Sequence, residues 1–201
     1  MPRPRTYERR DVVEAAKKAF WEGGYAGTAI ADLERSTGLN RSSLYLAFGS
    51  KRELFELALD RYTEDFIDPL IGGMEKASAG LDEIAEFFSR LKAEFREISR
   101  RGCLMVNTIA EVGDRSPKAV AYRDRLRRAF THALRGASRR GETEVAAVRR
   151  RVSMLLAATL GVWLSARIDP RDAGRLCDEI VAEVESWRQR GAGARALLLD
   201  A

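Results

Sequence analysis

Residues 39–51 have the sequence LNRSSLYLAFGSK, and the interpretation of the whole chain starts from this stretch. Asn40 is a residue type that commonly caps helix N-termini, so the spacing predicts a helix that begins at Arg41. Leu44 and Phe48 are four residues apart and would anchor one side of that helix. The first turn would then carry polar side chains: Arg41, Ser42 and Ser43.

The preceding residues 28–38, TAIADLERSTG, predict a second short helix. Thr28 is the expected N-cap, and Ile30 and Leu33 fall on one face. Gly38 lies where a tight turn needs a residue that tolerates positive φ. Two short helices joined in this way form a helix-turn-helix, whose second helix places its first residues against base edges in DNA.

Further landmarks surround this motif in register: Ala15-Ala16, Phe20, Gly24-Tyr25, Thr28, Gly38, Leu44-Tyr45, Phe48, Lys51 and Leu54. Over about the first 60 residues they resemble the DNA-binding segment of the TetR-type one-component transcriptional repressors. The resemblance implies a helix-turn-helix domain over residues 1–51 and a helical effector-binding and dimerisation domain over residues 52–201. One departure is Ala47, where family members often carry an aromatic residue or histidine.

The resemblance also implies which residues bind double-stranded operator DNA. Thr28, Tyr45 and Lys51 match positions that usually contact the DNA backbone. Arg41 has the donor geometry for a bidentate contact to guanine, or for pairing with phosphate. Ser42 and Ser43 are able to hydrogen-bond a base or a phosphate, and Arg3 and Arg5 of the N-terminal arm are expected near DNA or in solvent.

Composition and charge agree with this interpretation. The 201 residues suffice for one or two small domains, and the formal net charge is +5. Residues 1–51 contain nine Lys/Arg against six Asp/Glu, a net charge of +3, whereas the other 150 residues have +2. Positive charge is therefore denser where phosphate would be met. The two cysteines follow no metal-binding spacing, so we expect neither a metal nor a disulfide.

No signal peptide is evident, and a cytoplasmic location is expected. The most apolar segment, residues 152–166, has 15 residues without a charge. This is short of the ~20 needed to cross a bilayer, so a helix buried in protein is favoured and no membrane association is expected.

Apolar residues recur at helical spacing along the remaining chain, and no strand pattern occurs, so an all-α fold of about nine helices is predicted. Residues 51–79 should form one long helix, kinked at Pro69 or at Gly72-Gly73. Residues 81–100 and 103–112 predict two more helices. Ser116-Pro117 and Asp169-Pro170 are start signals for two others.

A small-molecule effector pocket is implied by the resemblance. Its candidate lining residues are Phe66, Met74, Phe88, Phe95, Cys103, Met105, Asn107, Thr108, Glu111 and Trp163. Most would be ordinary core in any helical protein, whereas three are polar on an otherwise apolar helix and need partners. Residues 101–107, RGCLMVN, resemble a motif from a branch in which some members sense electrophiles through a cysteine. Cys103 is thus either a sensor or a small buried residue.

Homodimer formation is implied by the same resemblance, through the last two long helices. The candidate interface residues are Leu156, Leu160, Trp163, Ile180, Val184 and Trp187. Burial within one chain would also account for these apolar side chains. Both arrangements remain open.

Enzymatic readings find little support, so no catalytic residue and no cofactor are expected. His132 is the single histidine, and neither a nucleophile elbow nor a phosphate-binding glycine loop is present. The alternatives that remain are an activator with the same fold, a cysteine-based redox sensor, and a helical module that binds protein instead of DNA.

Overall fold

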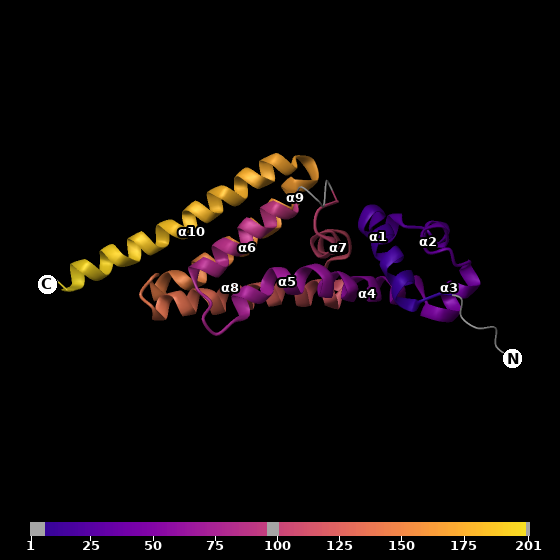
Figure 1. The fold of residues 1–201 in the computed structure, drawn as a ribbon, viewed down its shortest axis with the longest axis horizontal. Helices are drawn as coiled ribbons and strands as arrows, with labels where there is room; N and C mark the ends of the chain where they lie inside the picture. Colours follow the sequence, from indigo (N-terminus) through magenta and orange to yellow (C-terminus); the bar gives the residue numbers. More distant parts are fainter. Residues whose placement is uncertain (1–6, 96–100, 200–201) are drawn as a thin grey trace. The chain divides into compact units, whose positions relative to one another are not determined.

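A computed structural model describes residues 7–95 and 101–199, with side chains described up to residue 189 (Figure 1). The described residues contain helices and no strand, which confirms the all-α prediction. Helical backbone continues without a break from residue 51 to residue 75. Counted as one helix, this stretch gives nine α-helices in the described part of the chain, as predicted. The predicted positions of Arg3 and Arg5, and of residues 96–100, lie outside the described residues.

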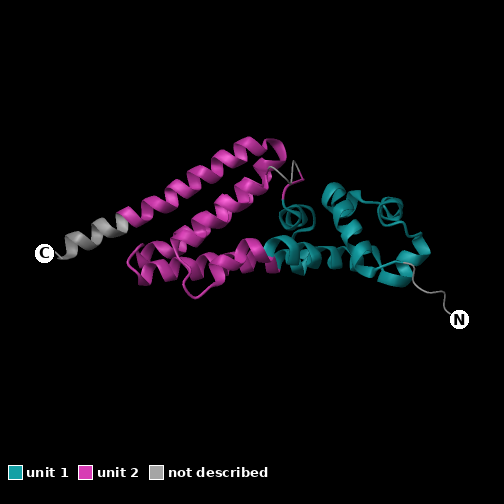
Figure 2. Ribbon diagram, in the orientation of Figure 1, with its two compact units in different colours: residues 1–67, 103–120 teal, residues 68–102, 121–201 magenta. Residues whose placement is uncertain are grey.

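Contacts between Cα atoms divide the chain into two compact units (Figure 2). Unit 1 comprises residues 1–67 and 103–120, and unit 2 comprises residues 68–102 and 121–201. The first unit therefore includes two helices that follow the predicted DNA-binding domain in sequence. The boundary that the sequence predicts after residue 51 remains a prediction.

Unit 1 is built on α1, which packs against three other helices. Its helical elements are α1 (Arg9–Gly27), α2 (Ile30–Thr37), α3 (Arg41–Phe48), α4 (Lys51–Tyr62), the π-helical turn η1 (Thr63–Ile67), α7 (Leu104–Val112) and the 3₁₀ turn η4 (Gly113–Arg115). Phe20 of α1 meets Phe55 of α4 edge-on, with ring centroids 4.9 Å apart. Lys17 is 7% exposed and pairs with both Glu14 and Asp65 at 2.7 Å. An aromatic core and a mostly buried ion pair therefore fix α1 on α4 and η1.

Unit 2 surrounds α6, which packs along α10, and α10 also packs against α9. Its elements are α5 (Asp68–Ile71), the 3₁₀ turns η2 (Gly72–Glu75) and η5 (Val145–Ala147), α6 (Leu81–Glu94), α8 (Pro117–Arg139, of which residues 117–120 belong to unit 1), α9 (Val148–Ile168) and α10 (Pro170–Leu199). Phe87, Phe88 and Phe130 form one aromatic cluster. The predicted helix starts at Pro117 and Pro170 are confirmed.

The long helix is irregular where the sequence predicts a kink. A π-helical turn occupies Thr63–Ile67, and a 3₁₀ turn begins at Gly72. Proline has no N–H, and its ring crowds the carbonyl four residues earlier. The wider π turn just before Pro69 is an irregularity of the kind that accommodates such a defect. Helical backbone thus continues through Pro69 instead of stopping there.

Candidate nucleic-acid interface

The first turn of α3 is fixed by side chains that accept its free backbone N–H groups. The side-chain Oδ1 of Asn40 accepts from the N–H of Ser43 at 2.9 Å, which confirms the predicted cap. A carboxylate of α2 adds a second acceptor, because Glu34 Oε1 lies 2.6 Å from the N–H of Arg41. Gly38 has φ +72°, the left-handed conformation that the turn between the helices requires. The start of α3 is therefore held in position by the sequence around it.

The inward face of α3 is anchored at both ends. Leu44 and Phe48 are buried, as predicted from their spacing. Arg9 of α1 lies over the Phe48 ring, with its guanidinium carbon 4.4 Å from the ring centroid. The same guanidinium donates to the carbonyl of Ala47 at 2.6 Å. Arg9 thus fastens the C-terminal end of α3 to α1, and the opposite face of α3 is left to solvent.

That solvent-facing side of α3 carries Arg41, Ser42, Tyr45 and Leu46, whereas Ser43 is half-buried. The Arg41 guanidinium carbon lies 5.5 Å from the centroid of the Tyr45 ring. Leu46 is 91% exposed, so its side chain is accessible to a partner of this face. Sequence reasoning omitted Leu46. Leu46 comes two residues after Leu44 and lies off the Leu44–Phe48 stripe, and this position was the sequence signal for its exposure.

Thr28 does not cap α2 as the sequence predicted. The cap position is Ala29, whose N–H donates to Asp32 Oδ2 at 2.7 Å. The Thr28 hydroxyl instead donates to the carbonyl of Gly24 at 2.6 Å, and the residue is 2% exposed. The Thr28 hydroxyl lies between free carbonyls at the end of α1 and free N–H groups at the start of α2. It donates to a carbonyl of α1 and therefore does not accept from an N–H of α2.

Lys51 lies at the start of α4, beside the ring of Tyr25. Its ammonium nitrogen is 4.6 Å from the Tyr25 ring centroid, so the ring faces a cation. Ser50 caps α4 by accepting from the N–H of Glu53 at 3.1 Å. The predicted contacts of Thr28, Lys51 and the α3 side chains with DNA remain predictions.

Glu111 of α7 binds the turn that precedes α2, within unit 1. Its carboxylate accepts from the backbone N–H of Tyr25 at 2.8 Å and of Ala26 at 2.5 Å. Gly24 has φ +71° and ends the regular part of α1. A Cβ at Gly24 would lie 3.0 Å from a Glu111 oxygen. This glycine therefore serves both the backbone conformation and the close approach of the carboxylate.

The predicted effector-pocket residues are distributed over both units. Phe66, Cys103, Met105, Asn107, Thr108 and Glu111 belong to unit 1, whereas Met74, Phe88, Phe95 and Trp163 belong to unit 2. Thr108 is buried, and its hydroxyl donates to the carbonyl of Leu104 at 2.8 Å, so its own helix satisfies it. Phe95 and Trp163 pack edge-on in the core of unit 2. Their assembly into one pocket remains a prediction.

The predicted interface residues are mostly buried inside a single chain. Leu156, Trp163, Val184 and Trp187 are each at most 5% exposed, and Leu160 and Ile180 are half-buried. Trp187 packs under the guanidinium of Arg151, 4.4 Å from its carbon. Four of the six side chains therefore have almost no surface left for a partner, and their role in a dimer remains a prediction.

Neither cysteine forms a disulfide, and both are buried. Burial raises the pKa of the Cys177 thiol to about 12.

Nowhere in residues 7–95 and 101–199 do three or more His, Cys, Asp or Glu side chains gather as metal ligands. Within the described residues, the segment 145–168 is the one helical stretch long and apolar enough to cross a membrane by length and composition, and 44% of its most apolar part is buried in the fold.

Comparisons with known proteins place these features in context. The model of "Bacterial regulatory proteins, tetR family" matches residues 12–58. The chain is 30% identical to the HTH-type transcriptional regulator TtgR of Pseudomonas putida, over 73% of this chain and 74% of TtgR. It is 31% identical to the HTH-type transcriptional repressor ComR of Escherichia coli, over 52% of this chain and 51% of ComR. A solved structure of the TetR family transcriptional regulator CifR, a cysteine mutant complexed with 26-bp double-strand operator DNA, is 26% identical with a TM-score of 0.76, and covers 93% of this chain and 98% of CifR.

Proposed function

This chain belongs to the TetR family of bacterial regulatory proteins, and from that premise we propose that it is a cytoplasmic repressor that binds operator DNA through α3. The exposed face of α3 carries this proposal, because a guanidinium, a hydroxyl, a phenol and a leucine project from one fixed helix. CifR was solved on operator DNA, and ComR is named a repressor. Repression is thus favoured over activation by the same fold.

The roles of the contacts follow from their chemistry. Arg41 is expected to donate two hydrogen bonds to guanine, and Leu46 to contact a thymine methyl group. Ser42 and Ser43 are expected to hydrogen-bond a base or phosphate, and Tyr45 and Lys51 to bind phosphate and so position the helix. Base contacts set sequence preference, whereas phosphate contacts add affinity for every sequence.

Operator binding by three variants tests these roles. Arg41→Ala should relax preference at one base pair by about 1–3 kcal/mol, whereas Lys51→Ala should weaken operator and random DNA alike. Arg128→Ala removes an exposed arginine of unit 2 that is not part of the helix-turn-helix, and this variant should bind as the wild type does. If Arg41→Ala discriminates operator from random DNA as well as the wild type, the base-reading role is refuted.

The operator-binding form is proposed to be a homodimer, because one helix-turn-helix contacts only a short half-site. Further side chains are exposed and available for it besides those predicted. Exposed small and apolar residues recur every three or four positions along one face of α9: Met154, Ala157, Gly161, Leu164 and Ile168. Leu176 of α10 is exposed as well. Leu164→Glu should produce monomers with weak operator affinity, and a stable wild-type monomer in light scattering at micromolar concentration would contradict the dimer.

A small molecule is proposed to release the repressor, by binding its two conformations unequally. The predicted pocket residues are the candidates for reversible binding, and covalent change at Cys103 is the alternative. Cys103→Ser separates the two, because loss of every electrophile response with intact DNA binding would assign the thiol as the sensor. If a reversible inducer still releases this variant from DNA, reversible binding in the pocket would be the mechanism of release.

No catalytic activity is proposed for this chain. His132 holds its Nε2 2.9 Å from the carbonyl of Lys76, so this ring nitrogen has a structural partner. Assays for hydrolysis of generic ester and phosphate substrates should show no rate above that of buffer.

A further inference from the structure

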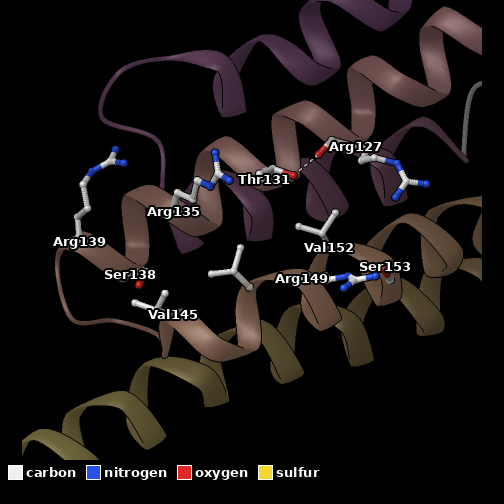
Figure 3. Close-up of a pocket in the computed structure, with 10 residues that line it drawn as sticks. Arg127, Thr131, Arg135, Ser138, Arg139, Val145, Arg149, Val152 and Ser153 are labelled. Carbon is white, nitrogen blue, oxygen red and sulfur yellow. Dashed lines mark hydrogen bonds between the residues drawn. The ribbon is translucent and has the colours of Figure 1, made fainter.

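A groove of about 660 Å³ lies within unit 2, between α8 and the η5–α9 segment (Figure 3). One wall comes from α8, with Arg127, Thr131, Arg135, Ser138 and Arg139. The other comes from η5 and α9, with Val145, Val148, Arg149, Val152 and Ser153. Its volume lies within the roughly 300–1,000 Å³ typical of small-molecule sites. None of the predicted effector-pocket residues lines it.

Positive charge at the groove is uncompensated. No carboxylate lines the groove. Four of the ten lining residues are arginines: Arg127, Arg135, Arg139 and Arg149. None of the four guanidinium groups forms an ion pair with a described carboxylate. Other arginines of unit 2, such as Arg125, Arg140 and Arg188, are paired with Asp or Glu. These cations line one groove that supplies no counter-charge, so an anion bound there would be attracted by their positive charge.

The groove also contains an apolar strip and an unused hydroxyl. Val145, Val148 and Val152 lie along one wall, and Val145 is 79% exposed. The Oγ of Ser138 is buried and has no hydrogen-bond partner among the described residues. By contrast, the Thr131 hydroxyl donates to the carbonyl of Arg127 at 2.8 Å. Buried polar groups are seldom left unsatisfied, so the Ser138 hydroxyl is a candidate hydrogen-bond partner for a ligand in the groove.

We propose that this groove binds an amphipathic anion. Its carboxylate, phosphate or sulfonate group would accept charge-assisted hydrogen bonds from the arginines, which suit the planar geometry of a carboxylate or phosphate. Its hydrocarbon part would cover the valine strip and remove apolar surface from water. The inference concerns binding to the DNA-free protein and does not depend on the proposed regulatory role.

Isothermal titration of the full-length protein with three probes tests both parts of the proposal. Decanoate carries the anion and the chain, decan-1-ol carries the chain alone, and inorganic phosphate carries charge alone. We expect decanoate to bind at least about tenfold more tightly than decan-1-ol, since a charge-assisted hydrogen bond is roughly twice as strong as a neutral one. It should exceed inorganic phosphate by a similar factor, because only its chain removes the apolar surface of the valine strip from water. A fourth titration with monodecyl phosphate distinguishes a carboxylate ligand from a phosphate ester.

The double variant Arg135→Gln/Arg149→Gln removes one arginine from each wall. Both side chains are exposed, so the fold should persist, and circular dichroism with thermal unfolding checks this. Decanoate affinity should fall about tenfold or more. Arg128→Gln is a control for the loss of one exposed arginine of α8 that does not line the groove. This control should bind decanoate as the wild type does.

Four outcomes would overturn the proposal. They are no saturable binding of either decanoate or monodecyl phosphate, equal binding of decan-1-ol, equal binding of inorganic phosphate, and equal loss in the Arg128→Gln control. If a second copy of the chain covers the groove, no saturable ligand binding would be seen, and the double variant would change its oligomeric state. An operator-binding assay of the same variants is a separate measurement, so failure of the anion site and failure of the repressor proposal are distinguishable.

Discussion

Replacing Glu111 with alanine should loosen the attachment of α7 to the turn that precedes α2. The carboxylate accepts two backbone N–H groups, from Tyr25 and Ala26. After the substitution both donors would lose their protein acceptor. Gly24, in its left-handed conformation beside the carboxylate, would have no side chain to replace the missing contact.

The cost follows from the number and exposure of these bonds. Hydrogen bonds to a charged group contribute about 1.5–3 kcal/mol each when shielded from water. Glu111 is exposed, so water would partly replace the lost hydrogen bonds, and each bond is expected to contribute about 1 kcal/mol to stability. Glu111→Ala should therefore destabilise the protein by about 2 kcal/mol, and the melting temperature should fall by about 4–8 °C. Glu111→Gln keeps one acceptor oxygen and should lose about half as much.

Urea unfolding followed by circular dichroism measures the free energy, and thermal scans measure the melting temperature. Asp114→Ala is the matched control, because Asp114 is an exposed carboxylate three residues further along the chain without an ion pair to a described residue. It should change stability by less than about 0.5 kcal/mol. If Glu111→Ala is as stable as this control, or if Glu111→Gln loses as much as Glu111→Ala, the assigned role of the carboxylate is refuted.

Three further results are expected. Lys17→Met should destabilise the protein by about 1 kcal/mol in urea unfolding, because it removes the mostly buried cation while Asp65, which is one-third exposed, keeps its ion pair with Arg61 at 2.7 Å, and an unchanged midpoint would contradict this. Hydrogen bonds from Arg125 lower the pKa of Glu75, so the ionised carboxylate stabilises the fold above its ordinary pKa of 4.5 and this contribution disappears as pH falls through the lowered value. Melting temperatures of Glu75→Gln should accordingly fall less steeply on acidification than those of the wild type, and parallel curves would count against the coupling. Burial and a pKa of about 12 should protect Cys177 from iodoacetamide at about pH 8 until the protein is denatured, and rapid labelling of the native state in mass spectrometry would disprove it.

Local sequence signals determined the helices of this protein. Asn40 and Ser50 cap helices with their own side chains, and Pro117 and Pro170 begin helices where their missing N–H is harmless. Each signal acts within a few residues, so the sequence alone suffices to place it. The exposed polar face of α3 followed in the same way from the Leu44–Phe48 spacing. Leu46 was overlooked because an apolar residue type does not by itself reveal exposure.

Tertiary structure decided which partner each remaining group obtains. Thr28 had two neighbouring sets of free backbone groups within reach, and only packing selected the end of α1. Glu111 accepts hydrogen bonds from backbone N–H groups about 85 residues away in sequence, and no local sequence pattern indicates these donors. Apolar periodicity identified Trp187 as inward-facing, but a stripe does not specify whether its own chain or a second copy covers it. The unpaired arginines between α8 and α9 likewise became a site only when two helices brought them together, because charge clustering across a groove depends on distance in space.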